Sequence, residues 1–337
     1  MAPSTTPAVI LARRPQGRFS ADDLSLTELP LAAPTAGQAL VRNTWMSLDP
    51  STRGRMDATD KQYTTNFEVG GPIDGWAVGV VEDSASDRLP TGATVRHRGG
   101  WRAWSLVDES AATLVDLELA PAQSWLSALG QTGFTAWAGL VEVGAMAAGD
   151  VVLVSGAGGG VGSMAGQFAR LLGASRVVGT AGGPDKCRWL QDEMGYSAVI
   201  DYRAGDIGTA LAAAAPDGVD LFFDNVGGDQ LVSALHQMAV GGRISLCGMM
   251  SNFSDQSAPS MAHLIEVVLR RLTLRGFIVR DHEAARPEFE RRVAQWLASG
   301  ELIDRATVFE GLDAAPTGLE GLLGGANFGK GLVRISE

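Results

Sequence analysis

The sequence predicts an α/β protein in which a mostly-β domain precedes a doubly wound parallel sheet. The first observation is a change of rhythm near Gly149. Short β-type runs broken by proline, glycine and aspartate precede it, and strands alternating with helices follow it. The second is a turn crowded with glycines between a strand and a helix, in the segment VVLVSGAGGGVGSMAGQFARLLG (151–173). A length of 337 residues suits two domains, and 45% hydrophobic residues supply their cores.

The N-terminal part, residues 1–125, is expected to form a small all-β unit such as a partly open barrel. Its β-type runs include QALVRNTWMSLDP, GWAVGVVEDS and TGATVRHRGGWRAWSLV. Their irregular spacing, with breaks at proline, glycine and aspartate, indicates strands joined by turns rather than crossover helices.

The second domain is expected over residues 126–300. The strand DVVLVSG is followed by a helix, in which apolar residues recur at helical spacing over 161–171. The strands RVVGTAGG and AVIDY enclose the helix PDKCRWLQDEMG, which has Pro184 near its start and Gly195 at its end. The alternation continues through GVDLFFDNVGG (strand), DQLVSALHQMAVGG (helix), RISLCG (strand) and LTLRGFIV (strand). Residues 301–337 lose this alternation and are expected to return to the first domain.

Composition excludes several classes of function. The net charge of -11 argues against nucleic acid as a partner, because binding to a phosphate backbone needs a basic face. The two cysteines and four histidines show no metal-ligand spacing, so no zinc site is expected. The first residues contain too short an apolar run for a signal peptide, and no run reaches the ~18 apolar residues of a membrane span. A cytoplasmic protein without disulfides is expected.

The glycine-rich turn has the spacing Ala157-x-Gly159-x-x-Gly162, a variant of the dinucleotide-binding fingerprint. Without a Cβ, the backbone can turn sharply and approach a pyrophosphate, and the helix that follows offers free N–H groups and a positive dipole end. The position between a strand and a helix is the context that this fingerprint requires, and it predicts a Rossmann fold. A turn that serves only close packing is the alternative.

The next strand indicates which dinucleotide is bound. NAD sites usually carry an acidic residue about 20 residues after the glycines, to bind the ribose 2′-hydroxyl. Here the strand ends as VVGTAGG without a carboxylate, Lys186 follows at the helix start, and Tyr202 and Arg203 end the third strand. A cation in place of an acid suits a 2′-phosphate, so NADP(H) is favoured. An ordinary solvated lysine is the alternative for Lys186.

These features, with several further strings, give the chain a family likeness. The strings are MSLDPSTRGRM, QYTTNFEVG, LGQTGFTAWAGL, VSGAGGGVGSMAGQFARLLG, FDNVGG, LCGMMSNF, RGFIV and GANFGKGLV. From about residue 40 to the end, the chain resembles the zinc-independent medium-chain dehydrogenases/reductases. The resemblance is to the group of prostaglandin reductases, alkenal double-bond reductases and bacterial NADPH-dependent curcumin reductases. It implies a GroES-like β domain on the substrate side, a Rossmann domain that binds NADP(H), and a homodimer.

The resemblance also implies cofactor-binding residues. In this sequence they are Gly158, Gly159, Gly160 and Val161 at the pyrophosphate, Lys186 and Tyr202 at the 2′-phosphate, Asn225 at a ribose, Cys247, Gly248, Met249, Met250, Ser251, Asn252 and Phe253 around the adenosine and pyrophosphate, and Phe277, Ile278, Val279 and Asn327 at the nicotinamide. Simpler roles remain open for some of them. Asn225 could cap a turn, Phe277 and Val279 could fill a core, and Cys247 fits a small buried residue better than a reactive thiol.

The activity implied is NADPH-dependent reduction of the C=C bond of an α,β-unsaturated ketone or aldehyde, with hydride passing to the β-carbon. The developing enolate oxygen needs a donor, and Tyr63 matches a tyrosine of the curcumin reductase type. A loop tyrosine with a packed ring is the alternative. Two departures from relatives are Ser51 and Thr52 in place of a Tyr-Met pair, and Arg280–His282 where relatives carry a tyrosine.

Aromatic residues and methionines in the connecting motifs suggest an apolar cleft, but they do not identify its ligand. The resemblance implies a small apolar substrate in which an alkene is conjugated to a carbonyl. Two other functions stay open. One is NADPH:quinone reduction on the same fold, and the other is NADPH binding without turnover.

Overall fold

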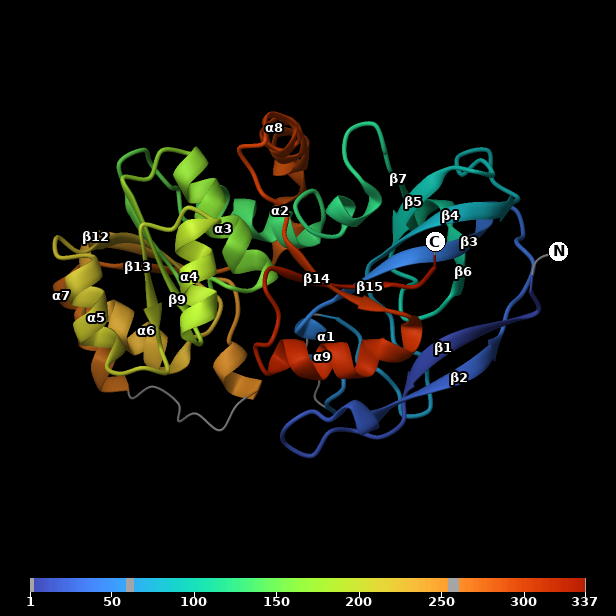
Figure 1. The fold of residues 1–337 in the computed structure, drawn as a ribbon, viewed down its shortest axis with the longest axis horizontal. Coiled ribbons are helices and arrows are strands. Elements are labelled where there is room, and N and C mark those ends of the chain that lie inside the picture. The colour runs from blue at the N-terminus through green and yellow to red at the C-terminus, as the bar shows by residue number, and fades with distance from the viewer. Residues whose placement is uncertain (1–2, 59–63, 254–260, 337) are drawn as a thin grey trace. The chain divides into compact units, whose positions relative to one another are not determined.

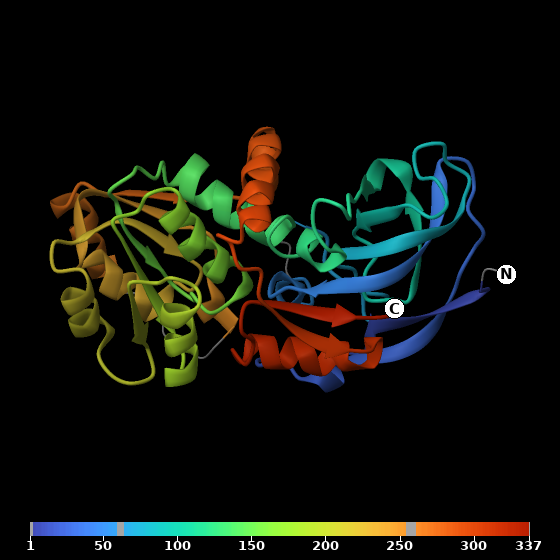
Figure 2. The same cartoon turned by 45° about the horizontal axis from the view of Figure 1, so that its top comes forward.

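The structure is a computed structural model that describes residues 3–58, 64–253 and 261–336. The chain divides into two compact units. One comprises Met1–Gly130 with Ala306–Glu337, and the other comprises Gln131–Arg305. Figures 1 and 2 show the ribbon of each unit in two orientations.

The unit of residues 131–305 is built on a six-stranded parallel sheet in the order β10-β9-β8-β11-β12-β13. Numbered within the unit, this is the order 3-2-1-4-5-6 of a Rossmann sheet. The strands are β8 Val151–Val154, β9 Arg176–Ala181, β10 Ala198–Asp201, β11 Val219–Asp224, β12 Met238–Leu246 and β13 Thr273–Gly276. The predicted doubly wound fold is therefore confirmed.

Helices flank this sheet (Figure 1). They are α2 Gln131–Trp137, α3 Gly160–Leu171, α4 Pro184–Asp192, α5 Ile207–Ala214, α6 Gly228–Leu235, α7 Ile265–Leu269 and α8 Arg286–Ser299, with a π-helical turn η4 Ala138–Val143 and 3₁₀ turns η5 Met250–Phe253, η6 Met261–Leu264 and η7 Val279–Ala285. Helices α5 and α6 pack together, and their apolar side chains share one core with those of the strands. Helices α2, α3 and α8 meet in an aromatic cluster that contains Phe134, Trp137, Phe168, Phe289 and Trp296.

The other unit is mostly β, as predicted. Its seven-stranded sheet has the order β14-β15-β3-β4-β5-β7, with β6 paired to β3, and β1 and β2 form a separate hairpin. The strands are β1 Thr5–Leu11, β2 Leu24–Pro30, β3 Gln38–Leu48, β4 Ala77–Ser84, β5 Thr94–His97, β6 Trp104–Asp108, β7 Thr113–Leu114, β14 Ala306–Glu310 and β15 Lys330–Arg334. The helical pieces are α1 Ser51–Gly54, α9 Ala315–Leu323, η1 Ala21–Asp23, η2 Glu109–Ala111, η3 Ala122–Trp125 and η8 Leu312–Ala314.

The C-terminal segment belongs to this β-rich unit, because β15 pairs antiparallel with the long strand β3. Leu332 of β15 lies opposite Ser47 of β3, and both side chains are buried. The C-terminal helix α9 contributes Leu319 and Leu322 to the core beneath β3. The last thirty residues of the chain therefore complete the sheet that the first hundred residues begin.

Two predicted elements are wrong in extent. The helix expected over DQLVSALHQMAVGG ends at Leu235, and Met238 already begins β12. Met238 pairs with Val219 of β11, so burial in the sheet outweighs the helical spacing of this segment. The strand expected over LTLRGFIV ends at Gly276, because β13 pairs with β12 only from Thr273 to Gly276 and the chain then turns into η7.

Candidate functional site

The glycine-rich turn joins β8 to α3 at the carboxyl edge of the parallel sheet. Gly156 has a φ of 58°, a left-handed conformation that favours glycine. Gly159 is the N-cap residue of α3, so no side chain caps this helix N-terminus. The free N–H groups and the dipole of the first turn are therefore available to an anion, as the fingerprint requires.

The glycines of this turn serve two different purposes. A Cβ on Gly162 would lie 2.3 Å from the carbonyl oxygen of Gly156, so this glycine allows the helix to pack against the strand. A Cβ on Gly159 would have its nearest neighbour at 3.4 Å, an ordinary contact. Close packing therefore accounts for Gly162 but not for Gly159.

Tyr196 packs against α3 and holds it by a hydrogen bond, a role that the sequence did not reveal. Its hydroxyl donates a 2.7 Å hydrogen bond to the carbonyl of Gly162, and its ring is buried. Gly166 and Gly179 make room for the ring, since a Cβ on either would lie within 2.8 Å of it. Glycine in the middle of a helix is unfavourable, so Gly166 was the available signal of a close approach.

The ends of β9 and β10 bring the predicted 2′-phosphate residues together. Lys186, in the first turn of α4, is buried with its aliphatic chain against Gly158, where a Cβ would lie 2.2 Å from Cδ. The hydroxyl of Tyr202 lies beside Gly182, 2.7 Å from the place of a Cβ. Burial and the charge of Arg203 lower the pKa of Lys186. The glycine-rich turn and the predicted 2′-phosphate residues therefore lie next to each other.

A buried hydrogen-bond network fixes the neighbouring strand ends. Ser155, after β8, donates to the carboxylate of Asp224 at the end of β11 over 2.6 Å. The same carboxylate accepts the N–H groups of Val226 and Gly227. Burial raises the pKa of Asp224 despite these bonds. Asn225 donates its side-chain amide to the carbonyl of Ser155 at 2.8 Å, so it acts as a structural residue of this turn as well as a predicted ribose ligand.

The segment after β12 lies against the same turn. The backbone N–H groups of Cys247 and Gly248 donate to the carbonyl of Asp224, and Ser251 donates to Val226. A Cβ on Gly227 would lie 2.7 Å from the sulfur of Met249. Burial, and then the charge of Asp224, raises the pKa of the Cys247 thiol to about 12, so it is protonated at neutral pH.

Of the remaining predicted residues in this segment, Met250, Asn252 and Phe253 belong to the 3₁₀ turn η5. In the glycine-rich turn, Gly158 precedes α3, and Gly160 and Val161 are the first residues of α3. The structure thus places this set at the carboxyl ends of neighbouring strands of one sheet, the usual ligand-binding edge of such sheets.

Phe277, Ile278 and Val279 follow β13 at the same edge. The ring of Phe277 packs at 6.5 Å from that of Phe223 in β11 and at 6.1 Å from that of His282. Gly139, in the π-helical turn η4, allows this approach, because a Cβ there would lie 2.9 Å from Phe277. Phe277 is therefore half-buried and packed against other rings, and its place at the nicotinamide stays a prediction.

Two further predicted residues belong to the part of the chain outside residues 131–305. Asn327 belongs to the β-rich unit, where it is buried and donates to the carbonyl of Gly329 at 2.6 Å. Tyr63, the candidate donor, lies outside the described residues. Ser51 and Thr52, the departure from relatives, open the short helix α1.

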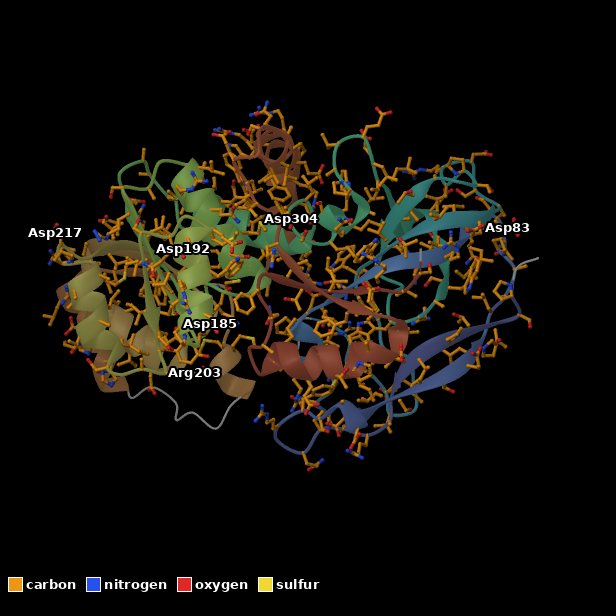
Figure 3. All side chains as sticks on the ribbon, in the orientation of Figure 1. Asp83, Asp185, Asp192, Arg203, Asp217 and Asp304 are labelled. Carbon is orange, nitrogen blue, oxygen red and sulfur yellow. The ribbon has the colours of Figure 1, made fainter. Side chains whose placement is uncertain are left out.

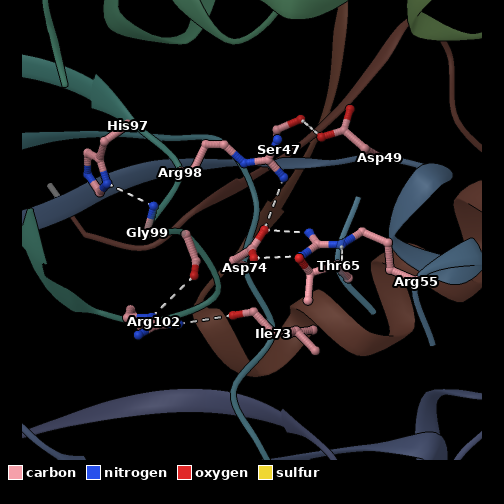
Figure 4. A network of polar contacts seen from close by, with 11 residues as sticks. Ser47, Asp49, Arg55, Thr65, Ile73, Asp74, His97, Arg98, Gly99 and Arg102 are labelled. Carbon is pink, nitrogen blue, oxygen red and sulfur yellow. Dashed lines mark hydrogen bonds and ion pairs between the residues drawn. The ribbon is translucent and has the colours of Figure 1, made fainter. Parts of the chain in front are cut away.

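The β-rich unit contains its own polar network (Figure 4). Asp74 forms ion pairs with Arg55 at 2.5 Å and with Arg98 at 3.1 Å. Lys330, from β15, binds the carboxylate of Asp49 at 2.6 Å, which in turn accepts from Ser47. Burial alone would raise the pKa of Asp49, but the charge and hydrogen bond of Lys330 outweigh it and lower the pKa. This network ties the MSLDP segment to the C-terminal strand.

No group of three or more His, Cys, Asp or Glu side chains among the described residues is arranged to hold a metal ion. No helix in the described part of the chain is long and apolar enough to cross a membrane.

Comparisons with known proteins agree with this geometry. Two family models match the chain, one described as the N-terminal domain of oxidoreductase over residues 8–115 and one as zinc-binding dehydrogenase over residues 160–299. The NADPH-dependent curcumin reductase of Escherichia coli is 35% identical over 97% of this chain and 96% of its own. The NADP(+)-dependent 2-alkenal reductase of Nicotiana tabacum is 33% identical over 90% and 88%. The crystal structure of CurA from Vibrio vulnificus in complex with NADPH superposes with a TM-score of 0.92, at 33% identity, over 98% and 99% of the two chains.

Proposed function

The chain belongs to the medium-chain dehydrogenase/reductase family, and from this premise we propose that it is an NADPH-dependent reductase of α,β-unsaturated ketones and aldehydes. The observation that carries the proposal is that the uncapped N-terminus of α3, the glycine loop and the Lys186–Tyr202 corner lie next to one another. The NADPH held by the structural relative supports a dinucleotide with a 2′-phosphate as the ligand.

Each of these parts would have a task toward the cofactor. The open backbone at Gly159 would admit the pyrophosphate, the first turn of α3 would supply N–H donors to it, and Gly158 leaves room for the Lys186 side chain. Lys186 and Tyr202 supply a cation and a hydroxyl to the 2′-phosphate. Asp224 and Ser155 hold the turn at Asn225, so the ribose meets a rigid edge rather than a mobile loop.

When bound, NADPH would supply the hydride that adds to the β-carbon of the substrate, and a proton from water or Tyr63 would complete the reduction at the α-carbon. The protein must then exclude water, orient an apolar substrate and stabilise the charge that develops on its carbonyl oxygen. We assign the substrate side to the β-rich unit and carbonyl stabilisation to Tyr63. A hydrogen-bond donor at the carbonyl oxygen can take the place of a metal ion in this chemistry, because it stabilises the enolate that forms before the α-carbon is protonated.

Isotope transfer tests this proposal. Cofactor carrying deuterium at the transferable position of C4 is incubated with an enone, and the product is analysed by NMR. Deuterium at the β-carbon of a saturated ketone is the expected result. A quinol formed from a quinone under conditions in which enones are untouched would support quinone reduction instead, and tight NADPH binding with no acceptor reduced would support a binding protein.

We further propose that the protein is a homodimer formed through the outer edge of the parallel sheet. Among the described strands, β13 is an edge strand, with β12 as its neighbour. Exposed apolar residues gather beside it, including Val240 at 64%, Ile265 at 53%, Val268 at 69% and Leu269 at 58% exposure. An open edge and an apolar patch are features that a two-fold interface would cover.

Light scattering gives the test of the dimer. The wild type is expected at twice the mass of one chain, and Val268→Asp is expected to shift it to one chain. A monomeric wild type would contradict the proposal.

The free thiols of Cys187 and Cys247 suit a reducing compartment, so we place the protein in the cytoplasm.

A further inference from the structure

We propose that Arg203 is the residue that makes the site selective for a 2′-phosphorylated dinucleotide, with Lys186 as its partner cation. This inference rests on the proposed function and names a specificity determinant within it. Arg203 directly follows Tyr202, after the end of β10, and its side chain is exposed (Figure 3).

The first argument is the convergence of side chains on one turn. A Cβ on Gly182 would lie 2.8 Å from Nε of Arg203 and 2.7 Å from the hydroxyl of Tyr202. The guanidinium of Arg203 lies over the Tyr202 ring, 5.6 Å from its centroid. Stacking of this kind restrains an otherwise flexible side chain. The glycine at position 182 thus allows a restrained guanidinium and a phenol to approach the turn that leads into α4.

The second argument is the placement of like charges. Lys186 lies on the same corner, and the charge of Arg203 opposes its protonation, as burial also does. Two cations held within electrostatic reach are unfavourable in the free protein, and a bound anion would relieve this repulsion. A phosphate monoester carries about -1.5 to -2 charges near pH 7. Lys186 alone cannot neutralise it, whereas the two cations together can.

The third argument concerns the nearby carboxylate. One oxygen of Asp201 accepts the backbone N–H groups of Gly183 and Arg203, each at 3.0 Å. These bonds, and then the charge of Arg203, lower the pKa of Asp201. Asp201 therefore ties the turn before α4 to the end of β10 and attracts Arg203 electrostatically, while the guanidinium of Arg203 lies over the Tyr202 ring.

The helix α4 offers a matched control. Arg188 lies on the same helix as Lys186 and is exposed, and it pairs with Asp185, also labelled in Figure 3. Replacing Arg188 removes the same charge from the same surface without touching the Gly182 turn. Both arginines are exposed, so neither substitution is expected to impair folding.

Calorimetric titration with fragments of the cofactor tests the inference without turnover. The ligands are adenosine 2′,5′-bisphosphate and 5′-AMP, and the variants are Arg203→Leu, Arg203→Lys and Arg188→Leu. Arg203→Leu is expected to raise the Kd for the bisphosphate about ten- to hundredfold, which corresponds to the loss of a charge-assisted hydrogen bond. The Kd for 5′-AMP should change by less than about twofold. Arg203→Lys should recover part of the loss, and Arg188→Leu should bind as the wild type does.

The outcomes separate this inference from the proposed function. If Arg203→Leu binds the bisphosphate within about threefold of the wild type while the wild type still prefers it to 5′-AMP, the role of Arg203 is wrong and the cofactor assignment stands. If the wild type binds both ligands equally, both are wrong. If the effect of Arg203→Leu is as expected but no enone is reduced, the specificity role holds and the reductase function fails.

Discussion

The two roles of the glycine loop can be separated by placing a single methyl group at two neighbouring positions. In Gly162→Ala the new Cβ would lie 2.3 Å from the Gly156 carbonyl oxygen and 2.7 Å from Cα of Ala157. Both atoms are backbone, so the helix or the loop must shift. Overpacking of this kind costs up to ~3 kcal/mol, and the higher helix propensity of alanine returns ~1 kcal/mol.

The expected net loss for Gly162→Ala is therefore about 2 kcal/mol. For a unit the size of residues 131–305, this corresponds to a fall in Tm of about 4–8 °C. Gly159→Ala is the matched variant. Its backbone at φ −84° and ψ 176° accepts any residue, and the nearest atom to its Cβ is at 3.4 Å. Its Tm should equal that of the wild type or exceed it slightly, because alanine reduces the entropy of the unfolded chain.

NADPH binding should respond in a different way from stability. On the proposed binding mode, the methyl group of Gly159→Ala would occupy space that the pyrophosphate needs, so the Kd for NADPH should rise at least about tenfold. Differential scanning calorimetry and fluorescence titration measure the two effects on the same samples. Wild-type NADPH affinity in a stable Gly159→Ala variant would refute the reasoning, because the loop would then serve packing alone.

Three further predictions concern buried polar groups. His97 is fully buried, accepts from Gly99 N–H, and has its pKa lowered by burial, and then by Arg102, to about 3. His97 binds a proton in the unfolded chain at a pH at which it stays neutral in the folded chain. The free energy of unfolding is therefore unaffected by His97 above pH 6.5 and declines as the pH falls toward 3. Urea unfolding should show that the free energy of unfolding falls by roughly 2 kcal/mol between pH 6.5 and about pH 5, and that this fall is absent in His97→Gln. An equal dependence on pH in the two proteins would contradict this. Lys330→Met should destabilise the β-rich unit by about 3 kcal/mol, since it leaves Asp49 without its cation, and adding Asp49→Asn should restore part of the loss in the same assay. Tyr196→Phe removes the buried bond to Gly162 and should cost ~1 kcal/mol with NADPH affinity within about twofold of wild type, whereas a large loss of affinity would assign Tyr196 a direct role.

The parts of the site that sequence could predict are those determined locally. The glycine turn, the missing acid after β9 and the lysine at the start of α4 all act through nearby backbone, and their spacing is visible in the chain. The parallel, doubly wound sheet also follows from the alternation of strands and helices together with the resemblance.

The remaining features depend on contacts between distant segments. Tyr196 supports Gly162 only because Gly166 and Gly179 leave space for its ring, which no local pattern shows. The sequence places Arg203 directly after Tyr202, but only the structure shows its guanidinium over the Tyr202 ring and beside Gly182. The segment at Met238 has helical spacing, yet pairing with Val219 makes it a strand. Tertiary packing overrides local preference at such positions.

The most direct test of the central claim is the rate of cofactor oxidation at 340 nm, with NADPH and NADH compared against enals, enones and quinones and with every product identified. We predict that NADPH is consumed with a saturated aldehyde or ketone as product, and that kcat/KM with NADH is at least about tenfold lower. Equal rates with NADH would contradict the assignment of the Lys186–Tyr202–Arg203 corner. A bound but unconsumed NADPH across the whole panel would contradict the reductase function itself.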